Sequence, residues 1–174
     1  MKRIYWGFIL IFFDFFLQIG DFSVGVLPDF AGYFLIVSGL RTMPDDIYEF
    51  QKIRIATLIA AILSTVVYFL DLVGLSAQLG YIATGIELCF TAFALYICYT
   101  IIVGIRELEK KNHVDLFAKK LRINWMLLVV AQFVIYVTIF VPQIFLICMV
   151  VSIAFTVSFV MAFRSCKRSY YYIF

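Results

Sequence analysis

Charged residues are scarce in this sequence, and hydrophobic residues dominate it. Of its 174 residues, 14% are charged and 65% are hydrophobic. A soluble domain typically has about 25% charged and 45–50% apolar residues, so this composition excludes an ordinary soluble domain. Uncharged runs occupy residues 88–105 and 123–163, the second interrupted by Pro142. Because about 20 apolar residues cross a bilayer core of about 30 Å, we expect an integral membrane protein.

Motifs of common enzyme classes are also missing. The sequence contains no H-E-x-x-H, no G-x-S-x-G and no P-loop. Its single histidine, His113, has no cysteine or histidine neighbour, and its four cysteines form no C-x-x-C pair. The sequence therefore predicts no enzyme, no metal and no cofactor. One alternative stays open, because Gly20-Asp21 resembles the Gly-Asp pair of intramembrane aspartyl proteases, with Asp14 as its partner.

Six apolar segments are long enough to be candidate spans. Because Lys2 and Arg3 precede an apolar run that has no A-x-A-like cleavage site, we interpret the first segment as a retained span. The six predicted spans are residues 4–19, 28–43, 53–73, 80–103, 122–141 and 143–163. The predicted fold class is all-α, a polytopic membrane helix bundle that forms a single integral membrane domain over residues 1–174.

Basic residues are absent from the connections between spans one and two, three and four, and five and six. All fourteen Lys and Arg residues lie at residues 2–3, 41–54, 106–122 and 164–168. Because Lys and Arg favour cytoplasmic loops, both termini are predicted to be cytoplasmic. The six spans then form three hairpins whose tips face outward.

Five carboxylates lie away from the basic segments, in the membrane or at its outer edge. They are Asp14, Asp21, Asp29, Asp71 and Glu87. On a helix, Asp14, Gln18 and Asp21 share one face, and Asp14 lies about 15 Å into the first span. A carboxylate in a low dielectric without a counter-charge binds a proton or cation more readily. These six polar residues are the candidate ion, proton or substrate site. Alternatively, Asp14 is a protonated hydrogen-bond donor to a neighbouring helix, and Asp21, Asp29 and Asp71 are solvated residues of the outer rim.

The start of the second span carries both a proline and an acid. Pro28 suits the first turn of a helix, and Asp29 interacts favourably there with the positive end of the helix dipole. Gly25, Gly32 and Gly39 then recur every seven residues, and such a stripe lets a second helix approach closely. We expect this span to be central and tightly packed.

The connection between the fourth and fifth spans is basic and amphipathic. Residues 106–121 predict a short helix on the inner leaflet, with Val114, Phe117 and Leu121 on its apolar side. Its expected contacts with anionic lipid are Lys110, Lys111, Lys119, Lys120 and Arg122. The run is short and interrupted by acids, so we predict no nucleic-acid partner.

The string LPDFAGYFLIVSGL, at residues 27–40, resembles the motif LPDFIGYxLIxxGL of small multi-spanning bacterial membrane proteins. The resemblance covers about a tenth of the chain, and this group has no assigned function. It implies a location in the bacterial inner, or cytoplasmic, membrane.

Two functions fit these patterns. The first is a small transporter or channel subunit for a cation, a proton or a small cationic solute, with the outward-opening carboxylates as its site. The second is a non-catalytic assembly, regulatory or immunity protein that acts through helix contacts with a protein partner or a second copy of the chain.

Overall fold

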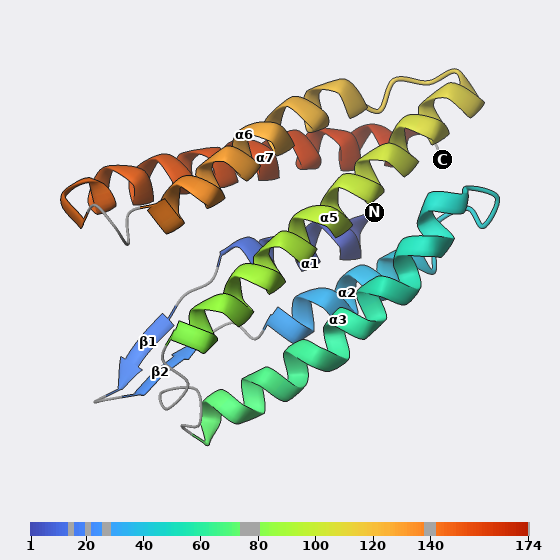
Figure 1. The fold of residues 1–174 in the computed structure, drawn as a ribbon. Coiled ribbons are helices and arrows are strands. Elements are labelled where there is room, and N and C mark those ends of the chain that lie inside the picture. Colours follow the sequence, from blue (N-terminus) through green and yellow to red (C-terminus); the bar gives the residue numbers. More distant parts are fainter. Residues whose placement is uncertain (14–15, 20–21, 26–28, 74–80, 138–141, 174) are drawn as a thin grey trace. The chain divides into compact units, whose positions relative to one another are not determined.

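The fold is helical apart from one short hairpin of strands (Figure 1). A computed structural model describes residues 1–13, 16–19, 22–25, 29–73, 81–137 and 142–173. Within these residues the helices are α1 (Lys2–Phe12), α2 (Asp29–Leu40), α3 (Tyr48–Leu72), α5 (Tyr81–Asn112), α6 (Ala118–Val137) and α7 (Phe145–Ile173). A 3-10 turn, η1 (Pro142–Ile144), precedes α7. The chain forms two compact units, Met1–Ile97 and Cys98–Phe174, and α5 belongs to both.

Three of the described helices are long and apolar enough to cross a membrane. They are Tyr48–Leu70 in α3, Gly85–Asn112 in α5 and Phe145–Ile173 in α7. Helix α2 is a shorter apolar helix. The prediction of a helical protein with membrane-spanning helices is confirmed to this extent, whereas six crossings and their direction stay predictions.

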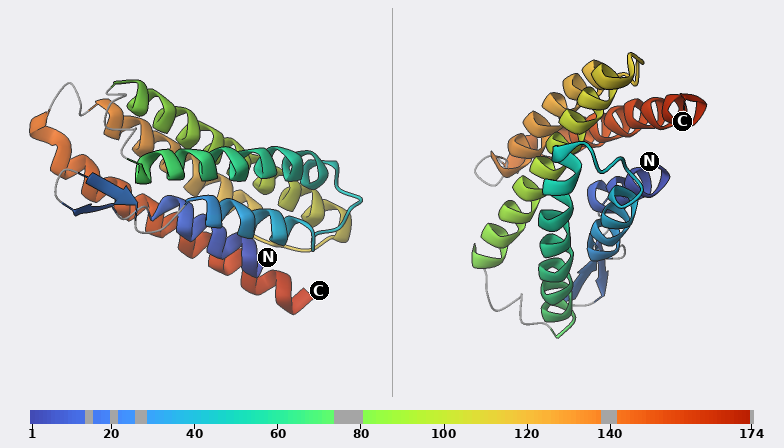
Figure 2. Two further views of the ribbon diagram at one scale, coloured as in Figure 1. Left: turned by 90° about the horizontal axis from the view of Figure 1, so that it is seen from below. Right: turned by 90° about the vertical axis from the view of Figure 1, so that its right-hand side faces the viewer.

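In the first unit, α1 and α2 lie side by side and antiparallel (Figures 1 and 2). Glycines permit their close approach. A Cβ atom added to Gly7 would lie 2.5 Å from Ile36 Cγ1 and 2.6 Å from the carbonyl oxygen of Gly32. One added to Gly39 would lie 2.5 Å from Ile4 Cγ1. No real Cβ atom tolerates such distances, so these helix backbones meet where a side chain would not fit.

Helix α3 packs on the same pair through contacts with α2. Its buried residues repeat at helical spacing and include small side chains, namely Ile53, Thr57, Ala60, Ala61 and Ser64. Near the start of α2, the rings of Phe30 and Tyr68 meet edge to face at 5.3 Å between centroids. This contact places the beginning of α2 beside the C-terminal half of α3.

The first predicted span differs from the structure, because α1 ends at Phe12. It is followed by an antiparallel pair, β1 (Phe16–Ile19) and β2 (Phe22–Gly25), in which Phe16 lies opposite Gly25. The sequence contains a reason for this difference. The segments F-L-Q-I and F-S-V-G are rich in aromatic and β-branched residues, and the two residues between them are Gly-Asp. This combination favours a two-residue hairpin, so the prediction of a helix to residue 19 was wrong.

In the second unit, α6 and α7 pack along much of their length. The buried side of α7 carries Phe159 and Phe163, and that of α6 carries Leu121 and Leu128. A side-chain hydrogen bond joins the two helices, with Ser158 Oγ 2.6 Å from Asn124 Oδ1. The buried positions of the two helices carry both large and small side chains.

Helix α6 also meets the C-terminal half of α5, where the ring centroids of Tyr99 and Trp125 lie 4.9 Å apart.

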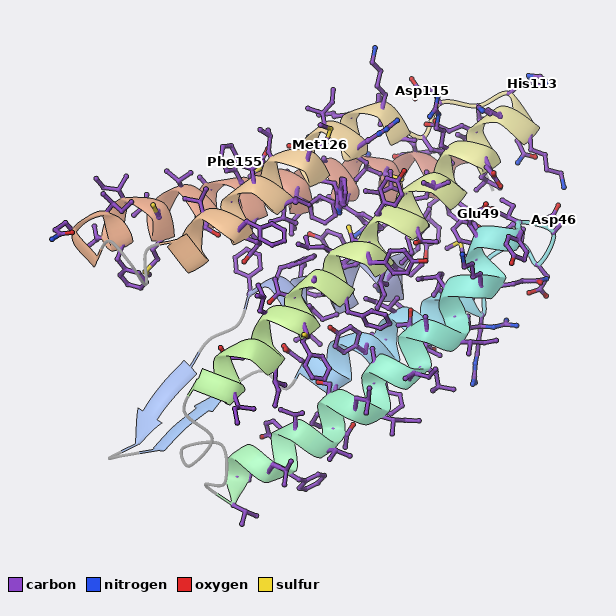
Figure 3. All side chains as sticks on the ribbon, in the orientation of Figure 1. Asp46, Glu49, His113, Asp115, Met126 and Phe155 are labelled. Carbon is purple, nitrogen blue, oxygen red and sulfur yellow. The ribbon has the colours of Figure 1, made fainter. Side chains whose placement is uncertain are left out.

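The predicted amphipathic helix over residues 106–121 is not a separate element. Helix α5 continues to Asn112, and α6 begins at Ala118. The connection, marked by His113 and Asp115 in Figure 3, includes positive φ angles at His113 and Phe117, a conformation that α-helices exclude.

The apolar side predicted for this helix also differs. Leu116 and Leu121 are fully buried, whereas Phe117 is 41% exposed. The connection is therefore a packed turn between two helices.

Candidate functional site

The predicted stripe of Asp14, Gln18 and Asp21 lies largely outside the described residues. Asp14 and Asp21 lie outside the described residues. Gln18 belongs to β1, where it lies opposite Ser23. Successive residues of a strand point to opposite faces, so the helical spacing that grouped Gln18 with the two acids does not apply.

The other predicted carboxylates lie on three different helices. Asp29 is the first residue of α2, Asp71 lies at the end of α3, and Glu87 is exposed in the second turn of α5. That these carboxylates meet in one cavity stays a prediction. Among the described residues, no group of three or more His, Cys, Asp or Glu side chains is placed to hold a metal ion.

Asp29 differs from the other two in its distance from basic residues on its own helix. At 1.5 Å per residue, Asp71 lies about 25 Å along the axis from Arg54, and Glu87 lies about 28 Å from Arg106. Both distances approach the thickness of a bilayer core. Asp29 lies only about 18 Å from Arg41. Along its own helix, Asp29 is therefore closer to a basic residue than Asp71 or Glu87 is.

Two helix ends meet near Asp29. A Cβ atom added to Gly32 would lie 2.7 Å from Ile11 Cγ1. The end of α1 therefore lies beside the start of α2. The last carbonyls of a helix have no partner within it and carry the negative end of its dipole. Asp29, the first residue of α2, is half-buried. Carbonyl and carboxylate oxygens are the groups that bind hard cations or receive protons.

The opposite end of the α1–α2 pair carries the basic residues. Arg3 Nη1 donates a hydrogen bond to Ser38 Oγ at 2.5 Å, which links the start of α1 to the end of α2. The pair therefore has one basic end and one end that carries a carboxylate.

The predicted packing glycines fall into two groups. Gly32 and Gly39 lie against α1 at distances that exclude a side chain. Gly25 ends β2 and so does not belong to α2. Sequence reasoning missed Gly7, the α1 residue that meets Gly32. Its signal was a small residue in the apolar part of the first span.

All five basic residues predicted to contact anionic lipid are exposed, namely Lys110, Lys111, Lys119, Lys120 and Arg122. They stand on the end of α5 and the first turns of α6, on either side of the packed connection. Glu109 Oε1 accepts hydrogen bonds from the backbone N–H groups of Leu116 at 2.7 Å and Ala118 at 2.8 Å. This carboxylate therefore fixes the start of α6, a role that the sequence analysis missed.

Two buried threonine hydroxyls of the long helices are satisfied locally. Thr57 Oγ1 donates to the carbonyl oxygen of Ile53, and Thr156 Oγ1 donates to that of Ser152, each within its own helix. Such bonds leave no demand for water around those side chains.

Comparison of the chain with protein-family models, with curated proteins and with solved structures found no match in any of the three.

Proposed function

We propose that the chain is a multi-pass protein of the bacterial inner membrane that crosses it six times, with both termini in the cytoplasm. The distribution of Lys and Arg supports this topology. Reporters fused after residue 74 and after residue 174 should report opposite sides of the membrane. The same location for both would contradict the topology.

In this topology the first crossing contains non-helical backbone. Helix α1 extends about 16 Å and α2 about 18 Å, each little more than half of the bilayer core. Strand β1 adds about 13 Å. At membrane depth, non-helical backbone is tolerated only where protein covers it or where it lines a water-filled cavity. Broken helices at such a depth are a common feature of transport sites.

We propose that the protein is a small transporter or channel subunit for a proton, a cation or a small cationic solute. The observation that carries this proposal is the half-buried carboxylate of Asp29 at the first residue of α2, a helix too short to cross the bilayer core alone. Asp14, Asp21, Asp71 and Glu87 would form the acidic outer approach that attracts a cation. Lys and Arg are absent from those outer segments, so nothing basic there opposes its entry.

Flux into proteoliposomes tests this function. The Asp29→Asn variant keeps the size of the side chain and removes its charge, so we expect a well-folded protein that has lost proton or cation flux. Asp71→Asn is the matched control, since the same change at the outer rim should reduce flux much less. Equal flux in the wild type and the folded Asp29→Asn variant would contradict the transport proposal.

A second candidate is a non-catalytic assembly, regulatory or immunity protein. It is favoured by the interiors of the long helices, where the Thr57 and Thr156 hydroxyls bond within their own helices. This function predicts no flux above empty liposomes for the wild type. It also predicts a defined complex with a protein partner or a second copy, which crosslinking in native membranes would detect.

A further inference from the structure

The C-terminal part of α7 carries a face of basic and aromatic side chains that the proposed transport function does not use. Arg164, Lys167, Arg168, Tyr171 and Tyr172 line an open hollow of about 440 Å³. Their spacing of three, four, seven and eight residues from the first places them on one side of the helix.

The opposite side of this helical segment is committed to packing. Ala162, Phe163 and Cys166 are buried, with at most 2% of each residue exposed. Arg164 and Arg168 are exposed, and Tyr172 is 77% exposed. The basic face is therefore directed away from the helix packing and open to a ligand.

Two of these side chains already form part of a binding surface. The guanidinium carbon of Arg168 lies 5.7 Å from the ring centroid of Tyr172, within the range of a cation–π contact. Stacking on a ring uses the flat face of the guanidinium group, and its N–H groups at the edge can still donate. Such a fork of donors matches the oxygens of a phosphate.

The position of this face along α7 identifies the source of the phosphate. The uncharged part of α7, residues 145–163, extends about 28 Å, which is close to the thickness of the bilayer core. Arg164 and Arg168 follow directly and would lie at the level of the lipid phosphates. Tyrosine rings also favour this interface.

We propose that Arg164, Lys167, Arg168, Tyr171 and Tyr172 form a binding site for the phosphate headgroup of an anionic phospholipid in the cytoplasmic leaflet. This inference rests on the proposed membrane topology. It is distinct from the contacts predicted for the lysines of α5 and α6, because it requires one defined lipid at one place.

Lipid binding to the full-length protein in detergent tests the site without flux or orientation. Dioleoyl phosphatidylglycerol is titrated, and bound lipid is counted by native mass spectrometry. Each basic residue near an anionic surface contributes about 5-fold in affinity. The Arg164→Gln/Arg168→Gln variant should therefore bind roughly 30-fold more weakly than the wild type. Dioleoyl phosphatidylcholine, which has no net charge, should not occupy the site.

The matched control removes the same charge elsewhere on the predicted inner side. Arg41→Gln/Lys52→Gln should bind one phosphatidylglycerol as the wild type does. An equal loss in both double variants would show diffuse attraction, and no loss in the Arg164/Arg168 variant would show that these side chains are not the site. Either result overturns the proposal.

Two further experiments test whether a loss of binding comes from misfolding and whether the ligand is a lipid or a soluble phosphate. Arg168→Lys keeps the charge and loses the fork, so a folded protein with severalfold weaker binding is expected, and wild-type binding would count against the fork. Inorganic phosphate at millimolar concentration should not displace the lipid. Displacement would assign the face to a soluble phosphate and overturn a lipid site. Failure of any arm leaves the flux results at Asp29 unaffected, so the two proposals fail separately.

Discussion

The α1–α2 pair and the α6–α7 pair differ in the length of their helices and in the residues through which they pack. Helices α1 and α2 are 11 and 12 residues long and meet through glycines. Helices α6 and α7 are 20 and 29 residues long, bury both large and small side chains, and are joined by a side-chain hydrogen bond. A long interface can be filled by side chains at many positions. A short one depends on close backbone contact, so each of its glycines matters more.

The largest expected effect is at Gly7. A methyl group there would lie 2.6 Å from the carbonyl oxygen of Gly32, so Gly7→Ala must push the helices apart. Overpacking of this kind typically destabilises a protein by about 1–3 kcal/mol. The free energy of unfolding, measured by titration with denaturing detergent, should fall accordingly.

Gly85 provides the matched control for Gly7, because an added Cβ at this helical glycine would meet nothing within 4 Å. Gly85→Ala should leave stability unchanged or raise it by up to about 1 kcal/mol, since alanine favours a helix. Equal effects at the two glycines would contradict the close contact of α1 and α2.

The next effect is expected at the connection that leads into α6. Glu109→Ala removes the acceptor of two backbone hydrogen bonds. Loss of a helix cap costs about 0.5–2 kcal/mol, and the same denaturation experiment measures it. Glu109→Gln keeps one acceptor oxygen and should lose less. If the alanine variant were as stable as the wild type, Glu109 would not fix the start of α6.

A smaller effect is expected between α6 and α7. The Ser158–Asn124 hydrogen bond is exposed to the surroundings of the helices. Interhelical hydrogen bonds in membrane proteins average about 0.6 kcal/mol in double-mutant cycles. A cycle of Ser158→Ala and Asn124→Ala should give a coupling of this size, well below the loss at Gly7. A coupling above that loss would reverse the comparison between the two pairs.

The long helices could be predicted because their signal is simple. Residues 53–73, 80–103 and 143–163 were expected, and α3, α5 and α7 contain nearly all of them. The observed helices extend further on the basic side, for example to Asn112 in α5. A hydropathy pattern ends at the first charges, whereas helical hydrogen bonding continues through them.

The short elements could not be predicted in the same way. Hydropathy alone fits a helix from Ile4 to Ile19. The hairpin is indicated only by the aromatic and β-branched residues of the two strands together with the Gly-Asp pair at residues 20–21. The start of α2 at Asp29 followed from the proline before it. The proposed depth of this helix start in the membrane could not be predicted from the sequence, because it depends on where α1 ends and on which residues face each glycine.

The central claim is that the start of α2 lies inside the membrane, and a depth measurement tests it most directly. In a variant without the four native cysteines, a spin label is attached at position 29, 71 or 87, and its accessibility to oxygen and to a soluble nickel complex is measured in liposomes. We predict a greater depth for position 29, roughly 8–12 Å below the outer boundary of the core, than for positions 71 and 87. Equal depths at the three positions would contradict the account.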